Sequence, residues 1–189
     1  MSKPRRYIQD MSAELLTADE LLRVNIKGKR TELIRGRLVV REPAGFRHGV
    51  VAAEIGRRLG DFVRSQSLGV VVAAETGFKI ASNPDTVRAP DAGYVSNAQL
   101  PTPLPRGYAD FHLDLAVEVL TPDDRAGEVL GKVSDWLESG ARLVWVIDPE
   151  RRVARVYRAD GDESVLSAAG VLDGEDVLPG FHCPLAELF

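Results

Sequence analysis

The spacing of apolar residues along the chain predicts two long helices. Four apolar residues between positions 47 and 65 recur at intervals of four, four and three, and they are Val51, Ile55, Leu59 and Phe62. This spacing forms one stripe of an amphipathic helix. A second helix is predicted over residues 128–139 (EVLGKVSDWLES), and Gly140 ends it. A shorter helix is expected within residues 12–24, where Thr17 and Glu20 have the spacing of a capping box.

Runs of β-branched and alternating residues predict strands before, between and after these helices. The strand-like segments are residues 31–34 and 37–40 around a Gly36 turn, 69–80 with a bulge or turn near Gly77, 87–95, 113–120, 141–149, and the hairpin 153–159 with 163–168. The proline-rich stretch 99–112 is expected to be an irregular loop. The order of elements predicts an α/β domain with a mixed central sheet flanked by helices, and with added β-hairpins at both ends.

Length and composition limit the class of protein. A chain of 189 residues is enough for one compact domain, and we expect a flexible arm over residues 1–11 and a single domain over 12–189. The 44% hydrophobic and 28% charged residues exclude global disorder and a coiled coil. No apolar stretch approaches the ~18 residues that a membrane helix needs, the N-terminal residues lack the apolar core of a secretory signal, and Cys183 is the single cysteine. We therefore expect a cytoplasmic protein with no membrane partner.

Charge is distributed unevenly along the chain. Residues 1–64 hold 14 basic and 8 acidic side chains, a balance of +6, whereas residues 65–189 hold 10 and 20, a balance of −10. Most of these charges are expected on the solvated surface, but the asymmetry also suggests a basic region that attracts phosphate beside an acidic region that holds a cation. Arg47, Arg57 and Arg58 are the candidate nucleic-acid contacts.

Two carboxylates and one lysine are the candidates for chemistry. Glu118 alternates with Val117 and Val119 in an apolar strand, and Asp91 follows Pro90 in another. Each acid can be satisfied by a nearby arginine, water or the backbone, but if the two strands pair, the acids converge and a divalent cation would relieve their repulsion. Lys132, at the edge of the stripe of the second helix, either leans toward this point or extends to solvent. Such a set suits metal-assisted phosphodiester hydrolysis.

These residues carry a resemblance to a known family. APD with Asp91, LAVEVLTPDD with Glu118, Lys132, and LVWVIDP over residues 143–149 resemble the Uma-two (Uma2) family of restriction endonucleases, in the PD-(D/E)xK nuclease superfamily. The likeness covers nearly the whole chain. It implies a restriction-endonuclease-like fold, Asp91 and Glu118 as ligands of Mg²⁺ or Mn²⁺, Lys132 as the catalytic lysine, and DNA as the substrate.

One position departs from the superfamily pattern, in which the lysine stands two residues after the acid. Leu120 occupies that position here, so either the lysine has moved to Lys132 or the site is inactive. Two further residues match the family. Glu32 either adds a third carboxylate or is a structural strand residue, and His48 either supports the site or is a hydrogen-bonded residue at a helix end.

The leading hypothesis is therefore a metal-dependent endonuclease acting on DNA. The alternative is a catalytically silent nuclease-fold protein that serves as a binding or assembly module, and a third interpretation is a plain α/β interaction domain. The sequence contains no phosphate-binding glycine loop of the GxxxxGK[ST] type and no HExxH motif. A homodimer is expected on general grounds, because cutting both strands of a duplex needs two sites.

Overall fold

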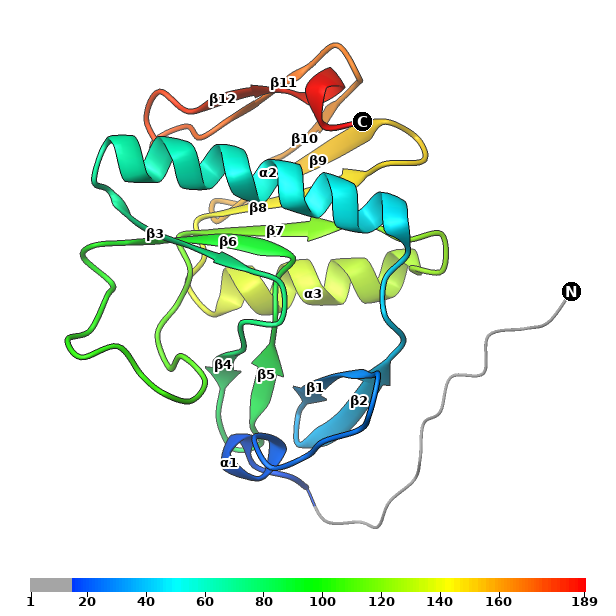
Figure 1. Cartoon of the computed structure of the whole chain (residues 1–189), viewed down its shortest axis with the longest axis vertical. Coiled ribbons are helices and arrows are strands. Elements are labelled where there is room, and N and C mark those ends of the chain that lie inside the picture. Colours follow the sequence, from blue (N-terminus) through cyan, green and yellow to red (C-terminus); the bar gives the residue numbers. More distant parts are fainter. Residues whose placement is uncertain (1–14) are drawn as a thin grey trace, which may run out of the picture.

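A six-stranded mixed sheet lies at the centre of the structure, a computed structural model that describes residues 15–189 (Figure 1). The strand order is β10-β9-β8-β7-β6-β3, with β7 and β8 parallel and all other neighbours antiparallel. The strands are β3 (Gly69–Ala73), β6 (Ala92–Ser96), β7 (Leu115–Val119), β8 (Leu143–Asp148), β9 (Val153–Arg158) and β10 (Glu163–Leu166). The predicted arm at residues 1–11 lies outside the described residues.

Two helices cover opposite faces of this sheet (Figure 1). Helix α2 (Phe46–Ser65) packs its buried stripe on one core, and α3 (Ala126–Glu138) packs on a second core. The stripe of α2 consists of Val51, Ile55, Leu59 and Val63. The expectation for Phe62 was therefore wrong by one residue, because the Phe62 ring is only partly buried and stands edge-on to Phe181 of the C-terminal segment.

Strand β7 serves both cores because successive side chains of a strand point to opposite faces. Leu115, Val117 and Val119 belong to the core under α2, while Ala116 belongs to the core over α3. Glu118 thus faces α3, on the side of the sheet that the alternation predicted.

A smaller antiparallel sheet lies beside the large one, with the order β2-β1-β5-β4. Its strands are β1 (Arg30–Ile34), β2 (Arg37–Arg41), β4 (Phe78–Ala81) and β5 (Thr86–Arg88). Helix α1 (Ala18–Leu21) closes its apolar side, and Thr17 and Glu20 form the predicted capping box.

Two of the predicted strand segments are each divided between the two sheets, the first at the turn that was expected near Gly77. Residues 69–80 form β3 and β4, which separate before Gly77, where any Cβ would lie 2.2 Å from the Tyr108 ring. Residues 87–95 contribute to β5 and β6, which separate at Pro90 because proline cannot donate a ladder hydrogen bond. This second break leaves Asp91 at the junction of the two sheets.

The C-terminal residues add strands β11 (Val171–Asp173) and β12 (His182–Pro184) and a short 3₁₀ helix η1 (Leu185–Leu188). Together with β1–β2 and β9–β10, they confirm the expectation of added hairpins at both ends. Within residues 15–189, none of the helices has the length and apolar character needed to span a bilayer.

Candidate active site

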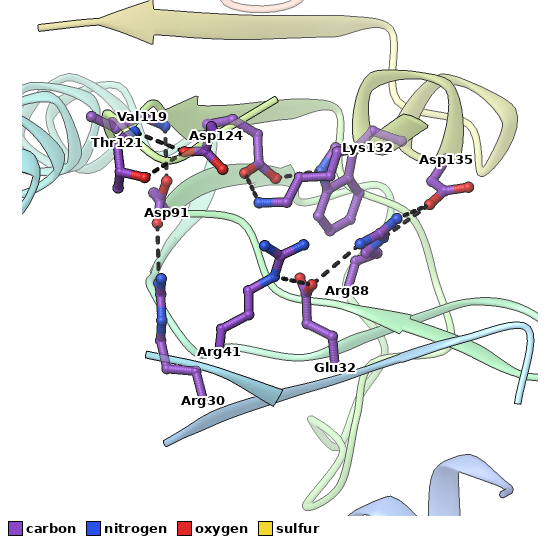
Figure 2. Close-up of polar contacts among 12 residues, drawn as sticks. Arg30, Glu32, Arg41, Arg88, Asp91, Val119, Thr121, Asp124, Lys132 and Asp135 are labelled. Carbon is purple, nitrogen blue, oxygen red and sulfur yellow. Dashed lines mark hydrogen bonds and ion pairs between the residues drawn. The ribbon is translucent and has the colours of Figure 1, made fainter. Parts of the chain in front are cut away.

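Asp91 lies at the start of β6 and is held there by contacts with β7, with helix α2 and with the smaller sheet. Its backbone N–H donates to the Val117 carbonyl at 2.9 Å, which continues the pairing of β6 with β7. Its Oδ2 accepts a hydrogen bond from the Val119 N–H at 2.8 Å and lies 3.1 Å from Nε2 of His48, in the first turn of α2. The Oδ1 atom lies 3.8 Å from Nη1 of Arg30 (Figure 2). The side chain is 8% exposed, so one carboxylate oxygen is anchored and the other faces the smaller sheet.

Glu118 receives two hydrogen bonds from α3. Lys132 Nζ donates to Oε2 at 2.6 Å, and the indole N–H of Trp136 donates to Oε1 at 2.8 Å. The two donors are four residues apart and therefore lie on one face of the helix. The turn before α3 is closed by Thr121, whose N–H and hydroxyl donate to Asp124 at 2.7 and 2.9 Å. Lys132 thus points to Glu118 and not to solvent.

A chain of buried and half-buried ion pairs joins the smaller sheet to α3 (Figure 2). Arg88 Nη1 donates to Glu32 Oε2 at 3.2 Å, and Arg88 Nε and Nη2 donate to Asp135 Oδ2 at 2.9 and 2.5 Å. Arg41 Nε donates to the same Glu32 oxygen at 3.2 Å. Glu32 therefore lies at the site, and its Oε2 atom is bound by two arginines.

Three arginines of this site, Arg30, Arg41 and Arg88, were not among the residues proposed from the sequence. The signal was present for two of them, because alternation in the β1–β2 hairpin places Arg30, Glu32 and Arg41 on one face. Arg88 comes to Glu32 only through the pairing of β1 with β5. That pairing joins residues more than fifty positions apart, and no local pattern reveals it.

The pKa shifts of the two acids run in opposite directions. Burial raises the pKa of Glu118, and the charge of Asp91 adds to the rise, while Lys132 and Trp136 oppose it. Burial also acts to raise the pKa of Asp91, but the His48 hydrogen bond and charge and the Val119 N–H outweigh it, so this pKa is lowered. The charge of Lys132 lowers the pKa of both acids, and the other groups that shift them differ.

The pKa values of Lys132 and Glu32 are shifted by neighbours of opposite charge. Burial lowers the pKa of Lys132, but the negative charges of Glu118, Glu32 and Asp91 more than offset this, and the net shift is upward. For Glu32, burial raises the pKa, and the charges of Lys132, Arg88 and Arg41 outweigh it to give a lowered value. The lysine ammonium is thus stabilised among three carboxylates.

The donor set of Asp91 and Glu118 fits a hard divalent cation. Each Glu118 oxygen accepts one hydrogen bond and keeps lone pairs free, and Asp91 Oδ1 accepts none from the part of the chain that is described. Mg²⁺ commonly binds through one or two carboxylates and keeps several waters. In that same part of the chain, no group of three or more His, Cys, Asp or Glu is placed to hold a metal ion. A cation here would take the remainder of its ligands from water.

The arginines that the sequence suggested for nucleic-acid contact lie along α2 and pair with carboxylates. Arg47 donates to Glu150 at 3.0 Å, Arg57 bonds both Glu54 and Asp61, and Arg58 bonds Glu54 and Glu187. None of these partners belongs to the group formed by Asp91, Glu118 and Lys132, named here the acid–lysine group. Their role in binding nucleic acid stays a prediction.

The structure is an α/β domain with a mixed central sheet, in which Lys132 contacts Glu118 and the charges of Asp91 and Glu118 interact. A model of the Uma2 family, described as "Putative restriction endonuclease", matches residues 18–186, and the chain therefore belongs to the Uma2 family. No curated protein matches it. The fold is similar to the crystal structure of "a putative nuclease belonging to DUF820" from Anabaena variabilis, with a TM-score of 0.78 and 21% identity, over 92% of this chain and 97% of that one. The restriction-endonuclease-like fold class is thereby confirmed.

Proposed function

We propose that this protein is an endonuclease that hydrolyses phosphodiester bonds of DNA with a divalent cation, Mg²⁺ or Mn²⁺. Asp91 and Glu118 hold the cation, and Lys132 is the catalytic lysine. The observation that carries the proposal is the 2.6 Å contact between Lys132 Nζ and Glu118 Oε2, made from α3. Because Leu120 cannot supply an ammonium group from the strand, α3 provides one at the same carboxylate.

The chemistry requires a water nucleophile and stabilisation of the charge that builds up on phosphate oxygens. Water forms the new P–O bond, the old P–O bond breaks, and the leaving oxygen takes up a proton. A bound divalent cation supplies Lewis acidity and lowers the pKa of its water. The Lys132 ammonium stabilises charge on the phosphate oxygens. Trp136 and the Val119 N–H hold the two carboxylates in orientation, and His48 supports Asp91.

The direct test is incubation with supercoiled plasmid in Mg²⁺, in Mn²⁺ and in EDTA. We expect nicked or linear product with either metal and none in EDTA. Asp91→Asn and Glu118→Gln should lose this activity. Asp114→Asn is the matched control, because Asp114 is also buried but bonds the Ser96 N–H outside the site. Equal loss in the control would mean that the first two variants report only on stability.

Metal binding can be tested apart from cleavage. Calorimetric titration of Mn²⁺ should give binding heat for the wild type and none for Asp91→Ala or Glu118→Ala, with circular dichroism unchanged. Removing one carboxylate relieves like-charge repulsion, so neither variant needs the metal to fold. Wild-type heat in both variants would contradict a shared site.

The alternative function is a catalytically silent nuclease-fold module that serves in binding or assembly. It is favoured by Leu120 at the usual lysine position and by the arginines that already neutralise Glu32. It predicts binding of duplex DNA with intact plasmid in both metals.

For the nuclease we expect a homodimer, because cutting a duplex needs two sites, and light scattering measures its mass directly.

A further inference from the structure

Two arginines stand side by side on the face of the β1–β2 hairpin that looks toward the acids. Arg30 and Arg41 are directly opposite each other in the antiparallel register. Figure 2 shows both side chains extending from the hairpin toward Asp91 and Lys132. Like charges directly opposite on paired strands are destabilising. Hairpin stability therefore does not account for this pair.

Both guanidinium groups have donors to spare. The side chain of Arg30 makes no hydrogen bond within residues 15–189. Its Nε is buried without a partner, and its one contact with a charge is the 3.8 Å approach to Asp91. Arg41 uses only Nε, toward Glu32, so its two terminal nitrogens donate to nothing in the described structure. A guanidinium carries five N–H donors, and most of these ten are unused.

Two arginines whose donors are paired contrast with Arg30 and Arg41. Arg88 has a side chain only 5% exposed and spends three hydrogen bonds on Glu32 and Asp135. Arg57 also makes three hydrogen bonds to carboxylates. The side chains of Arg30 and Arg41 are 29% and 24% exposed, so their free donors can be reached from solvent. Arg30 and Arg41 thus combine unused N–H donors with exposure to solvent.

We propose that Arg30 and Arg41, named here the hairpin clamp, bind backbone phosphates of duplex DNA beside the acid–lysine group. The proposal rests on the proposed function and identifies how its substrate is held. A phosphate approaching Glu32, Asp91 and Glu118 meets three carboxylates, so N–H donors that those acids leave free are needed to bind it. Arg30 and Arg41 each contact one of the acids but keep their other donors free. The planar guanidinium fork matches two phosphate oxygens, and the clamp offers two such forks.

The test measures binding of a labelled short duplex by fluorescence anisotropy across a series of salt concentrations. Glu118→Gln protein in Mg²⁺ is the common background, because cleavage is expected to stop there. Adding Arg30→Gln or Arg41→Gln should weaken binding and reduce the slope of log K against log[salt] by about 0.9 each, the loss of one phosphate contact. Arg155→Gln is the matched control, since Arg155 is an exposed strand arginine paired with Glu163, and it should leave the slope unchanged.

A conservative variant separates substrate contact from support of the fold. Arg30→Lys keeps the charge but lacks the fork, so it should keep the salt slope and bind more weakly than arginine. If Arg30 and Arg41 only neutralise Asp91 and Glu32, the glutamine variants will lower the melting temperature without altering the slope, and the clamp is refuted.

The outcomes for the clamp and for the nuclease differ. Plasmid cleavage by the wild type with an unaltered slope in both glutamine variants overturns the clamp and leaves the nuclease standing. An arginine-dependent slope with no cleavage by the wild type supports the clamp and overturns the nuclease. Absence of duplex binding overturns both.

Discussion

The two faces of the six-stranded sheet are buried equally well but are used differently. Under α2 the contacts are apolar, and Trp145 stacks on Phe181 at 5.8 Å between ring centroids. Over α3, the equally buried Trp136 donates its indole N–H to Glu118. The Trp145 N–H has no hydrogen-bond partner within residues 15–189. The face under α2 thus serves burial apart from His48 at the start of that helix, which contacts Asp91. The face over α3 combines burial with the placement of Glu118.

An amphipathic stripe does not by itself indicate whether the residues of that helix face also hold a functional side chain. The two tryptophans occupy similar apolar surroundings, one in each core. What distinguishes them is a partner on the facing strand, since Glu118 stands opposite α3 and only apolar residues of β7 stand opposite α2.

The largest effect is expected on the α2 face. Ile55→Ala should lower the free energy of unfolding by about 2–5 kcal/mol, because it opens a cavity in a fully buried core. Urea unfolding measures this cost, and cleavage per folded molecule should be unchanged. Val50→Ala on the same helix, where the residue is about half exposed, should stay within about 0.5 kcal/mol. A loss of specific activity in Ile55→Ala would contradict the conclusion that the core under α2 contributes stability and not cleavage.

The second-largest effect is expected at Lys132, the charged residue of α3 that contacts Glu118. Lys132→Met should keep the fold and the metal but lose about 10²-fold in cleavage rate, which is ~2.7 kcal/mol of transition-state stabilisation. Lys132→Arg should rescue poorly, because a planar fork does not replace a compact ammonium. The control is Lys79→Met, since Lys79 pairs with Asp85 in the smaller sheet. Wild-type cleavage by Lys132→Met would refute the assignment of the lysine.

A smaller effect should separate the two tryptophans. Trp136→Phe and Trp145→Phe both remove ring volume, but only the first removes a hydrogen bond to a buried carboxylate. We expect Trp136→Phe to cost about 1.5 kcal/mol more in unfolding free energy than Trp145→Phe. Equal costs by urea titration would mean that the indole N–H of Trp136 contributes nothing to holding Glu118.

The smallest effect is expected on the solvent side of α2. Hydrogen bonds from Arg57 and Arg58 lower the pKa of Glu54 from 4.5 to about 2. A lowered folded-state pKa stabilises the protein above the ordinary value, and this stability is lost as the pH falls toward about 2. Because the group is near the surface, Glu54→Gln should cost only about 0.3–1 kcal/mol at neutral pH.

Urea unfolding at several pH values tests this prediction. The difference between the wild type and Glu54→Gln should shrink below about pH 4.5. Glu75→Gln is the control, since Glu75 is exposed and forms no ion pair within residues 15–189, and its difference should stay near zero. A cost for Glu54→Gln that is independent of pH would exclude the ion pairs as its cause.

The sequence by itself determined the local elements and the face that each presents. Periodicity identified the α2 stripe apart from Phe62, the Gly36 hairpin and the capping box at Thr17, because these depend on residues only a few positions apart. For Lys132 the residues left two directions open, toward the acids or to solvent, and the structure selects the contact with Glu118. Lys132 follows Glu118 by fourteen positions, which contain a turn and the helix that returns along the parallel pair β7–β8.

Only the tertiary structure decided which faces meet. The breaks at Gly77 and Pro90 divide two apparently continuous strands between two sheets, and the pairing of β1 with β5 then brings the hairpin arginines to the acids. On α2, Arg57 and Arg58 pair locally with Glu54, and only the fold adds the contact of Arg58 with Glu187. The physical reason is that alternation determines the side of a strand on which a residue lies, whereas the element that covers that side depends on pairing between residues distant in the chain.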